Sequence, residues 1–173
     1  MSDQRGVAAW KKHTTAFDRV RSIAGALDRA RTAQYIAAEA AVSETTAHDH
    51  LERLVGMSVV RTVPGEDATR YEPDPLYGRF RTLRRLIDEH DHGELLGLKA
   101  DLQEAIEGFE TRYDIASPTS LRERAAETDT ATETREFLKD ASDWELTQYH
   151  LSIVEDAIEN YGEYANPDER AHA

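Results

Sequence analysis

Histidines and carboxylates gather in two short stretches of the sequence and could, by their chemistry, bind a metal ion. The first stretch contains Asp88, His90, Asp91, His92 and Glu94, and the second contains His48 and His50. On a helix, residues two apart point in different directions, so neither His-x-His pair forms a natural chelate there. We therefore predict no metal site and interpret the first stretch as a solvated loop between helices, with metal sensing at that stretch as the alternative.

Motifs that carry catalysis are missing from the sequence. It contains no GxGxxG, GxxxxGK(S/T), GxSxG or HExxH pattern, so the parts needed for dinucleotide, P-loop, hydrolase or zincin chemistry are lacking. The absence of cysteine excludes disulfides, thiol nucleophiles and cysteine-ligated metals. The sequence thus predicts no catalytic residue, no cofactor and a protein that is not an enzyme.

A third set of polar residues has the spacing of one helix face. Ala47, Leu51 and Leu54 recur at i, i+4 and i+7, and Ser43 precedes them as an N-cap, which predicts a helix over 44–55. Its outward face carries Glu44, Thr45, Thr46, His48, Asp49, Glu52 and Arg53. Short polar groups on a helix can hydrogen-bond base edges in the major groove of DNA. The alternative is an ordinary solvated helix face.

The elements on either side would position this helix. An apolar stripe from Phe17 to Leu27, with Thr15 and Asp18 as a capping pair, predicts a helix over 15–29. Thr32 then caps a short helix whose inward face is Ala33, Ile36, Ala37 and Ala40. After the 44–55 helix, β-branched residues at 59–63, turn residues at 64–67 and a second strand-like run at 69–72 predict a hairpin.

This order resembles the winged helix-turn-helix transcription regulators, in particular the ArsR/TrmB-like and MarR-like proteins of archaea. The residues that carry the resemblance are Thr32-Ala33-Gln34-Tyr35-Ile36-Ala37, the run from Val42 to Leu54, and Gly65 with Thr69-Arg70-Tyr71-Glu72-Pro73 in the wing. The match covers close to a third of the chain. The resemblance implies a recognition helix at 44–55 in the major groove and a wing at 59–72 on the DNA backbone or in the minor groove.

The recognition helix departs from the family pattern because it is acidic. Phosphate contacts must then come from other residues, and the best candidates are Arg29, Arg31, Arg61 and Arg70, together with Lys11 and Lys12. The complete set of predicted DNA-binding residues is Arg29, Arg31, Thr32, Gln34, Ser43, Glu44, Thr45, Thr46, His48, Asp49, Arg53, Arg61 and Arg70.

The second half of the chain differs sharply in charge. Residues 1–85 hold 14 Lys or Arg and 11 Asp or Glu, whereas residues 86–173 hold 7 and 23. This asymmetry predicts that the first part meets a polyanion, and we divide the chain into a winged helix-turn-helix domain at 1–75 and an α-helical region at 76–173. The fold class is therefore mainly α with a small β-hairpin wing, followed by a coiled-coil-like arm.

The arm is predicted to form a homodimer. Apolar residues recur at the spacing of one face of a long helix, and this face needs another surface to pack against. The residues are Leu95, Leu98, Leu102, Ile106, Phe109 and Tyr113. Possible capping boxes begin at Ser120, Thr130 and Ser142, and they predict three further helical pieces, the last from 143 to about 164. In the alternatives, the arm holds an effector pocket among Phe109, Tyr113, Trp144, Tyr149 and Tyr161, or docks as part of a protein-interaction module.

Composition places the protein among acidic, salt-adapted chains. The sequence has 17 Arg but only 4 Lys, a net charge of -13 and no long apolar run or signal-peptide pattern. This is typical of a halophilic archaeon, in which molar salt screens repulsion within about 3 Å, and it predicts a cytoplasmic protein with no membrane partner. We expect a homodimeric regulator of double-stranded DNA, by default a repressor; activation and a small-molecule effector stay open.

Overall fold

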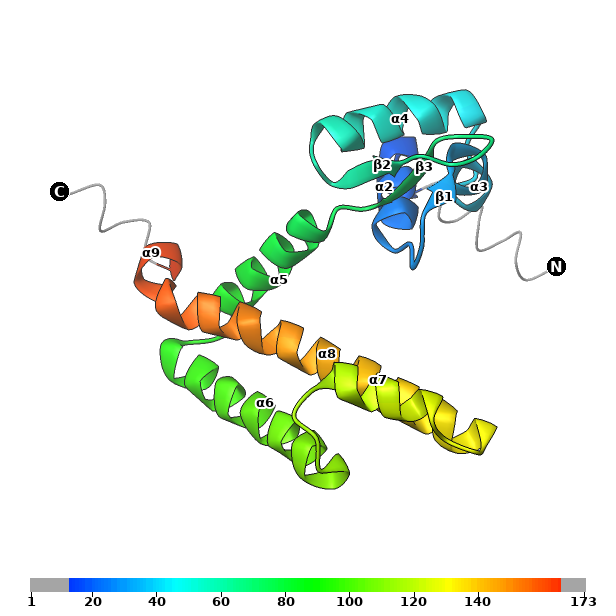
Figure 1. Cartoon of the computed structure of the whole chain (residues 1–173). Helices are drawn as coiled ribbons and strands as arrows, with labels where there is room; N and C mark the ends of the chain where they lie inside the picture. The colour runs from blue at the N-terminus through cyan, green and yellow to red at the C-terminus, as the bar shows by residue number, and fades with distance from the viewer. Residues whose placement is uncertain (1–12, 166–173) are drawn as a thin grey trace. The chain divides into compact units, whose positions relative to one another are not determined.

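The computed structural model describes residues 13–165 and is mainly helical, with one small antiparallel sheet (Figure 1). The chain divides into two compact units between Phe80 and Arg81. This division falls within one helix, α5 (Pro75–Glu89), whereas the predicted domain boundary at 75/76 lies at its first residue. Each unit has a hydrophobic core of its own.

In the part of the first unit that the structure describes, residues 13–80, three helices and three strands precede α5. They are α2 (Ala16–Gly25), β1 (Arg31–Thr32), α3 (Ala33–Glu39), α4 (Glu44–Gly56), β2 (Val60–Val63) and β3 (Arg70–Pro73). The strands pair in the antiparallel order β1-β3-β2, and Tyr71 of β3 lies opposite both Arg31 and Thr62. The two-residue strand β1 was not predicted, because two residues are too few to show an alternating pattern.

Side-chain caps start the helices where the sequence indicates. Thr15 and Asp18 form a complete capping box on α2, and the hydroxyls of Thr32 and Ser43 accept the backbone N–H groups of Tyr35 and Thr46. Each cap satisfies a donor that the first helical turn leaves without a partner. The three predicted N-termini are therefore confirmed.

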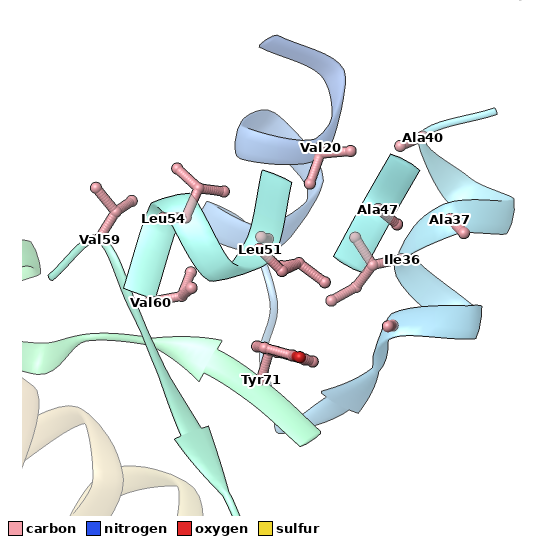
Figure 2. Packing of buried hydrophobic residues seen from close by; sticks show 12 residues of the cluster. Val20, Ile36, Ala37, Ala40, Ala47, Leu51, Leu54, Val59, Val60 and Tyr71 are labelled. Carbon is pink, nitrogen blue, oxygen red and sulfur yellow. The ribbon is translucent and has the colours of Figure 1, made fainter. Parts of the chain in front are cut away.

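The predicted apolar stripes meet in one core (Figure 2). Ile36 of α3 and Leu51 of α4 are fully buried and lie beside Tyr71 of the sheet, while Val20 covers the same core from α2. Arg19 is also buried: its Nε donates to the Ala40 carbonyl at 2.9 Å and its Nη1 to the Thr14 carbonyl at 2.9 Å. These bonds satisfy a buried guanidinium and fix α2 against the end of α3.

The second unit is built from helices packed on one long helix. After α5 come α6 (His92–Tyr113), α7 (Pro118–Ala126), α8 (Ala131–Glu159) and α9 (Tyr161–Ala165). Both α6 and α7 pack against α8, and two clusters fill the spaces between them. Trp144 and Leu121 are fully buried in one cluster, and Leu95 and Ala157 in the other. Within residues 13–165, no helix combines the length and the hydropathy that crossing a membrane requires.

Two of the three capping boxes predicted in this unit are wrong. Ser117, not Ser120, caps α7, and α8 runs without a break through Ser142. The Ser142 hydroxyl instead donates to the Leu138 carbonyl one turn earlier at 2.9 Å, which a serine inside a helix can do at little cost. Only Thr130 acts as predicted, accepting the Glu133 backbone N–H at the start of α8.

The predicted dimer stripe on α6 has an intramolecular partner. Leu95 and Tyr113 are buried, and Leu98, Ile106 and Phe109 pack against clusters that include residues of α8. The remaining member, Leu102, is half-buried. The stripe therefore does not need a second chain to cover it, and dimerisation through these residues stays a prediction.

The five aromatic residues considered as an effector pocket do not gather at one place. Phe109 stacks on Trp144 with ring centroids 5.6 Å apart, and Tyr113 meets Phe137 edge to face. Tyr161 instead packs in the other cluster against His92, and the side chain of Tyr149 is exposed. Three of the five are core residues of one cluster, so the proposed grouping is wrong.

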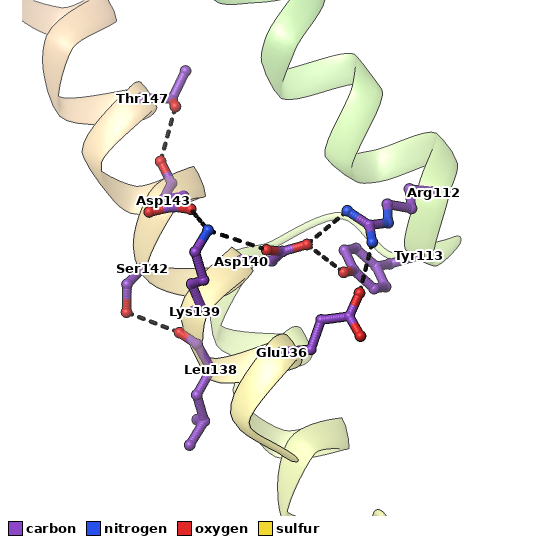
Figure 3. A network of polar contacts seen from close by, with 9 residues as sticks. All are labelled: Arg112, Tyr113, Glu136, Leu138, Lys139, Asp140, Ser142, Asp143 and Thr147. Carbon is purple, nitrogen blue, oxygen red and sulfur yellow. Dashed lines mark hydrogen bonds and ion pairs between the residues drawn. The ribbon is translucent and has the colours of Figure 1, made fainter. Parts of the chain in front are cut away.

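A polar network joins α6 to α8 beside the Trp144 cluster (Figure 3). The Asp140 carboxylate is buried and accepts a hydrogen bond from the Tyr113 hydroxyl at 2.5 Å and another from Arg112 at 2.8 Å. Arg112 also donates to Glu136 at 2.8 Å, and its guanidinium lies 5.1 Å from the Tyr113 ring centroid. A buried carboxylate is tolerated here because both a cation and a hydroxyl compensate it.

Because of this network, the free energy of unfolding should fall at alkaline pH. Burial, then the hydrogen bond to Asp140, raises the pKa of Tyr113 to about 12, from the ordinary 10.0. Folding favours the protonated phenol, so its contribution to stability is complete below pH 10 and is lost as pH rises through about 12. We expect Tyr113→Phe to reduce the fall in unfolding midpoint over that range, measured by circular dichroism. Tyr149→Phe, at an exposed tyrosine, should keep the wild-type slope, and equal slopes in both variants would contradict this role.

Candidate nucleic-acid interface

Helix α4 presents the polar face that the sequence indicates. Ala47, Leu51 and Leu54 hold it against the core, which leaves Glu44, Thr45, His48, Asp49, Glu52 and Arg53 exposed. Thr45 and Asp49 make no recorded side-chain contact within the part of the chain that the structure describes. Their hydrogen-bonding groups are therefore free for a ligand.

Other predicted DNA-binding residues on this helix make contacts within the unit. The hydroxyls of Ser43 and Thr46 hydrogen-bond each other at 2.7 Å, and Thr46 is half-buried. The guanidinium of Arg53 lies over the ring of Phe17, 4.7 Å from its centroid, which places it toward α2. The His48 ring lies edge-on to Tyr71, with its Nε2 3.9 Å from Glu44. His48, like Ser43 and Arg53, is nevertheless exposed.

The β2–β3 hairpin stands beside α4. Its turn needs glycine at position 65, because a Cβ there would lie 2.3 Å from the Ala68 carbonyl oxygen. Arg61 is bound to Glu72 across the hairpin at 2.7 Å, so its charge is largely compensated. Arg70, opposite Thr32 and Val63 in the sheet, is exposed and makes no ion pair with any residue between 13 and 165.

Strand β1 brings a second basic group to the sheet. The Arg31 guanidinium lies over the Tyr35 ring, 4.5 Å from its centroid, and its Nε is buried without a hydrogen-bond partner among residues 13–165. Arg29, just before the strand, is exposed, and the described residues offer it no recorded partner. Sequence analysis missed Tyr35, which is 38% exposed and orients Arg31. Spacing alone does not identify this contact, because Arg31 lies on strand β1 and Tyr35 on the following helix α3.

The electrostatics of this unit are mixed. Residues 13–80 hold 8 Arg, no Lys and 10 Asp or Glu. The exposed acids Glu44, Asp49 and Glu52 lie on α4 itself, and burial, followed by the charge of Glu52, raises the pKa of Tyr71. The predicted phosphate contacts Lys11 and Lys12 lie outside the described residues. Of the predicted phosphate contacts that the structure describes, Arg61 is paired with Glu72, which leaves Arg29, Arg31 and Arg70, all on or beside the sheet.

The predicted DNA-binding residues thus separate into two groups. Arg29, Arg31, Gln34, Glu44, Thr45, His48, Asp49 and Arg70 retain exposed or unpaired polar groups. Thr32, Ser43, Thr46, Arg53 and Arg61 are used as caps or are paired with other side chains of the unit. The capping and paired residues therefore hold in place the elements that carry the exposed ones.

Metal ligation finds no support among residues 13–165, where no three His, Cys, Asp or Glu side chains converge. Asp91 and Glu94, suggested above as ligands, form the capping box of α6. His90 lies 3.9 Å from Glu94, and the His92 ring packs edge to face on Tyr161. These side chains therefore cap α6 or make contacts where α5, α6 and α9 pack together.

Comparison with known proteins places the chain in a family. A family model described as a family of unknown function, DUF7342, matches residues 14–163. The chain belongs to DUF7342. The match runs through both compact units. No curated protein and no solved structure matches the chain.

Proposed function

We propose that this DUF7342 protein is a sequence-specific DNA-binding transcriptional regulator of the winged helix-turn-helix type that acts as a homodimer and represses by covering promoters. The observation that carries the proposal is the topology of the first unit: helix, strand, helix, helix, then a hairpin whose second strand pairs with the first. This arrangement resembles winged helix-turn-helix domains, in which the third helix of the set enters the major groove.

The exposed groups support the same reading. Thr45, His48 and Asp49 lie on one face of α4 and can donate to or accept from base edges. Arg70 on β3 and Arg31 on the adjacent strand β1, with Arg29 just before β1, would supply phosphate contacts from the sheet. Buried residues anchor all of these elements, so the face is preorganised.

The acids of α4 shape how such a contact would work. Glu44, Asp49 and Glu52 repel phosphates at low ionic strength, where the Debye length is about 10 Å at 0.1 M. At about 1 M salt the Debye length falls to about 3 Å, and hydrogen bonds to base edges then decide affinity. A salt-adapted regulator with such a helix gains specificity from direct contacts more than from counterion release.

The same acids favour a second candidate function. A helix with three exposed carboxylates and its one arginine stacked on Phe17 also fits a basic protein surface. In that case the winged unit would be a protein-interaction module and not a DNA reader.

Genome-wide chromatin immunoprecipitation in the native host tests the DNA proposal. We expect wild-type protein to give sharp peaks with a shared, roughly palindromic motif, and Thr45→Ala/His48→Ala/Arg70→Ala to lose them, because each change removes an exposed group without touching a cap. The matched control is Thr132→Ala/His150→Ala/Arg135→Ala, which removes the same residue types from exposed positions of the helical unit. Peaks that survive in the first variant would contradict the assignment of α4 and the hairpin.

Neutralising the acids separates the two functions. In Glu44→Gln/Asp49→Asn/Glu52→Gln, repulsion of phosphates is removed, so DNA binding should strengthen if α4 faces DNA. A basic protein partner would instead be lost in pull-downs with the same variant. The measurement is DNA binding by fluorescence anisotropy at two salt concentrations alongside the pull-down.

A further inference from the structure

The middle of α8 exposes large apolar side chains. Leu138, Leu146 and Tyr149 are 43%, 52% and 43% exposed. On another side of the same turns, Ala141 and Trp144 are fully buried in a cluster with residues of α6 and α7. The helix therefore packs inside its unit through one side and presents a second apolar surface that the unit leaves uncovered.

The exposed residues follow the spacing of a contact between two helices. Leu138, Ser142, Glu145 and Tyr149 are all exposed, and the steps between them are four, three and four residues. This is the spacing of the residues that join the helices of a coiled coil. The set reads alike from both ends, with apolar residues outside and polar ones inside. Two antiparallel copies of α8 would therefore place Leu138 opposite Tyr149 and Ser142 opposite Glu145.

The charges around this face are compensated within the chain. Residues 86–173 hold 7 basic and 23 acidic residues, so two copies repel each other over most of this half. All four acids between residues 136 and 149 nevertheless have basic partners inside the unit. The ion pairs are Glu136 and Asp140 with Arg112, Asp143 with Lys139, and Glu145 with Arg122. A second acidic copy can thus approach this face with little repulsion.

Arg122 of α7 supports the polar centre of the face. Its guanidinium donates to both carboxylate oxygens of Glu145 and, at 3.3 Å, to the Ser142 hydroxyl. That hydroxyl donates in turn to the Leu138 carbonyl. Both polar groups therefore keep hydrogen-bond partners when a second helix excludes water. In an antiparallel pair, two arginines and two glutamates would lie together near the axis, which complements charge between the copies and favours one register.

We infer that α8 pairs antiparallel with α8 of a second copy, with Leu138 packed on Tyr149 of the other chain and Ser142 and Glu145 at the centre. The same contact repeats with the copies exchanged, so the dimer closes with twofold symmetry. Leu146 borders this contact and adds apolar area. The inference rests on the proposed function only for the expectation that two copies act together, and it moves the dimer contact from the packed 95–113 stripe of α6 to an exposed face.

Light scattering on the full chain without DNA tests the dimer. The wild-type chain should be dimeric at high micromolar concentration, and Leu138→Gln should weaken self-association at least about tenfold, because an apolar contact is lost twice in each dimer. Leu96→Gln, at an exposed leucine of α6, is the matched control and should leave the dimer intact. Both leucines are exposed within one chain, so neither change should lower the unfolding midpoint of dilute protein. A monomeric wild-type chain, or equal association in both variants, would overturn the inference.

Disulfide trapping tests the orientation and register. The chain has no cysteine, so each introduced thiol reports one position. Leu138→Cys mixed with Tyr149→Cys should cross-link under mild oxidation, because the two Cα atoms would lie within the roughly 4.4–6.8 Å that a disulfide spans. Either variant alone should link slowly, since identical positions would lie about 16 Å apart along the helix axis. The control mixture is Leu96→Cys with Tyr149→Cys. Equal rates in the two mixtures, or faster linking of identical variants, would overturn the antiparallel pairing.

Failure of this surface and failure of the proposed function give different results. Trapping needs no DNA, whereas DNA binding is measured by immunoprecipitation. Cross-linking between positions 138 and 149 without chromatin peaks would support the dimer and contradict the regulator. Chromatin peaks without that cross-link would contradict the α8 contact alone.

Discussion

Trp144→Ala is expected to destabilise the helical unit by about 3–5 kcal/mol, the usual cost of truncating a buried tryptophan. Trp144 is fully buried, stacks on Phe109 at an interplanar angle of 11°, and packs with Tyr113, Leu121 and Ala141. Its removal leaves a cavity where α6, α7 and α8 come together. Because domains have only about 5–15 kcal/mol of stability in total, this unit should be largely unfolded near physiological temperature.

Two control variants make the Trp144 prediction specific. The Trp144 Nε1 is buried with no hydrogen-bond partner in the described part of the chain, so Trp144→Phe, which keeps a stacking ring and removes that donor, should cost much less than the alanine change. Tyr149→Ala, at an exposed aromatic of the same helix, should change stability little. Thermal unfolding by circular dichroism gives the midpoints, and hydrogen exchange with mass spectrometry locates the change. Comparable losses in all three variants would contradict the assigned core.

Leu51→Ala is expected to cost the first unit about 2–5 kcal/mol and, with it, DNA binding. Leu51 has no exposed surface and lies on the buried side of α4, in one cluster with Val20, Ile36 and Tyr71 (Figure 2). The cavity left by the shorter side chain loosens α4 and the sheet together. The face carrying Thr45 and Asp49 would then lose its fixed position without any change in its own residues.

The two compact units make the Leu51 experiment internally controlled. Hydrogen exchange should increase in α2, α3, α4 and the sheet, while α6, α7 and α8 keep wild-type protection. Leu51→Met, which conserves volume, should cost less than about 1.5 kcal/mol and retain binding. Increased exchange in α8 equal to that in α4 would show that the chain unfolds as one body and would contradict the division.

The sequence by itself determined the local structure of the first unit. The caps at Thr15, Thr32 and Ser43 and the spacing of Ala47, Leu51 and Leu54 predicted where helices start and which sides are buried, and the structure confirms both. Turn residues around Gly65 placed the hairpin. These features depend on interactions within a few residues, which pattern and propensity capture. The DNA-reading face of α4 follows from the same pattern and stays a prediction.

The sequence patterns did not show which element each apolar face or polar side chain would contact, and this became clear from the tertiary structure. Leu95 to Tyr113 has the spacing of a stripe that needs a partner, and nothing local distinguishes a second chain from α8, which supplies most of that partner here. Ser142 and Glu145 match the pattern of a capping box, but α8 continues through them, and the Ser142 hydroxyl donates to the Leu138 carbonyl inside the helix. The pairing of β1 with β3, and the placement of Arg53 over Phe17 and of Arg31 over Tyr35, also depend on contacts that the fold creates. The physical reason is that helical periodicity shows which face is apolar, whereas the choice of what covers that face is made by the whole chain.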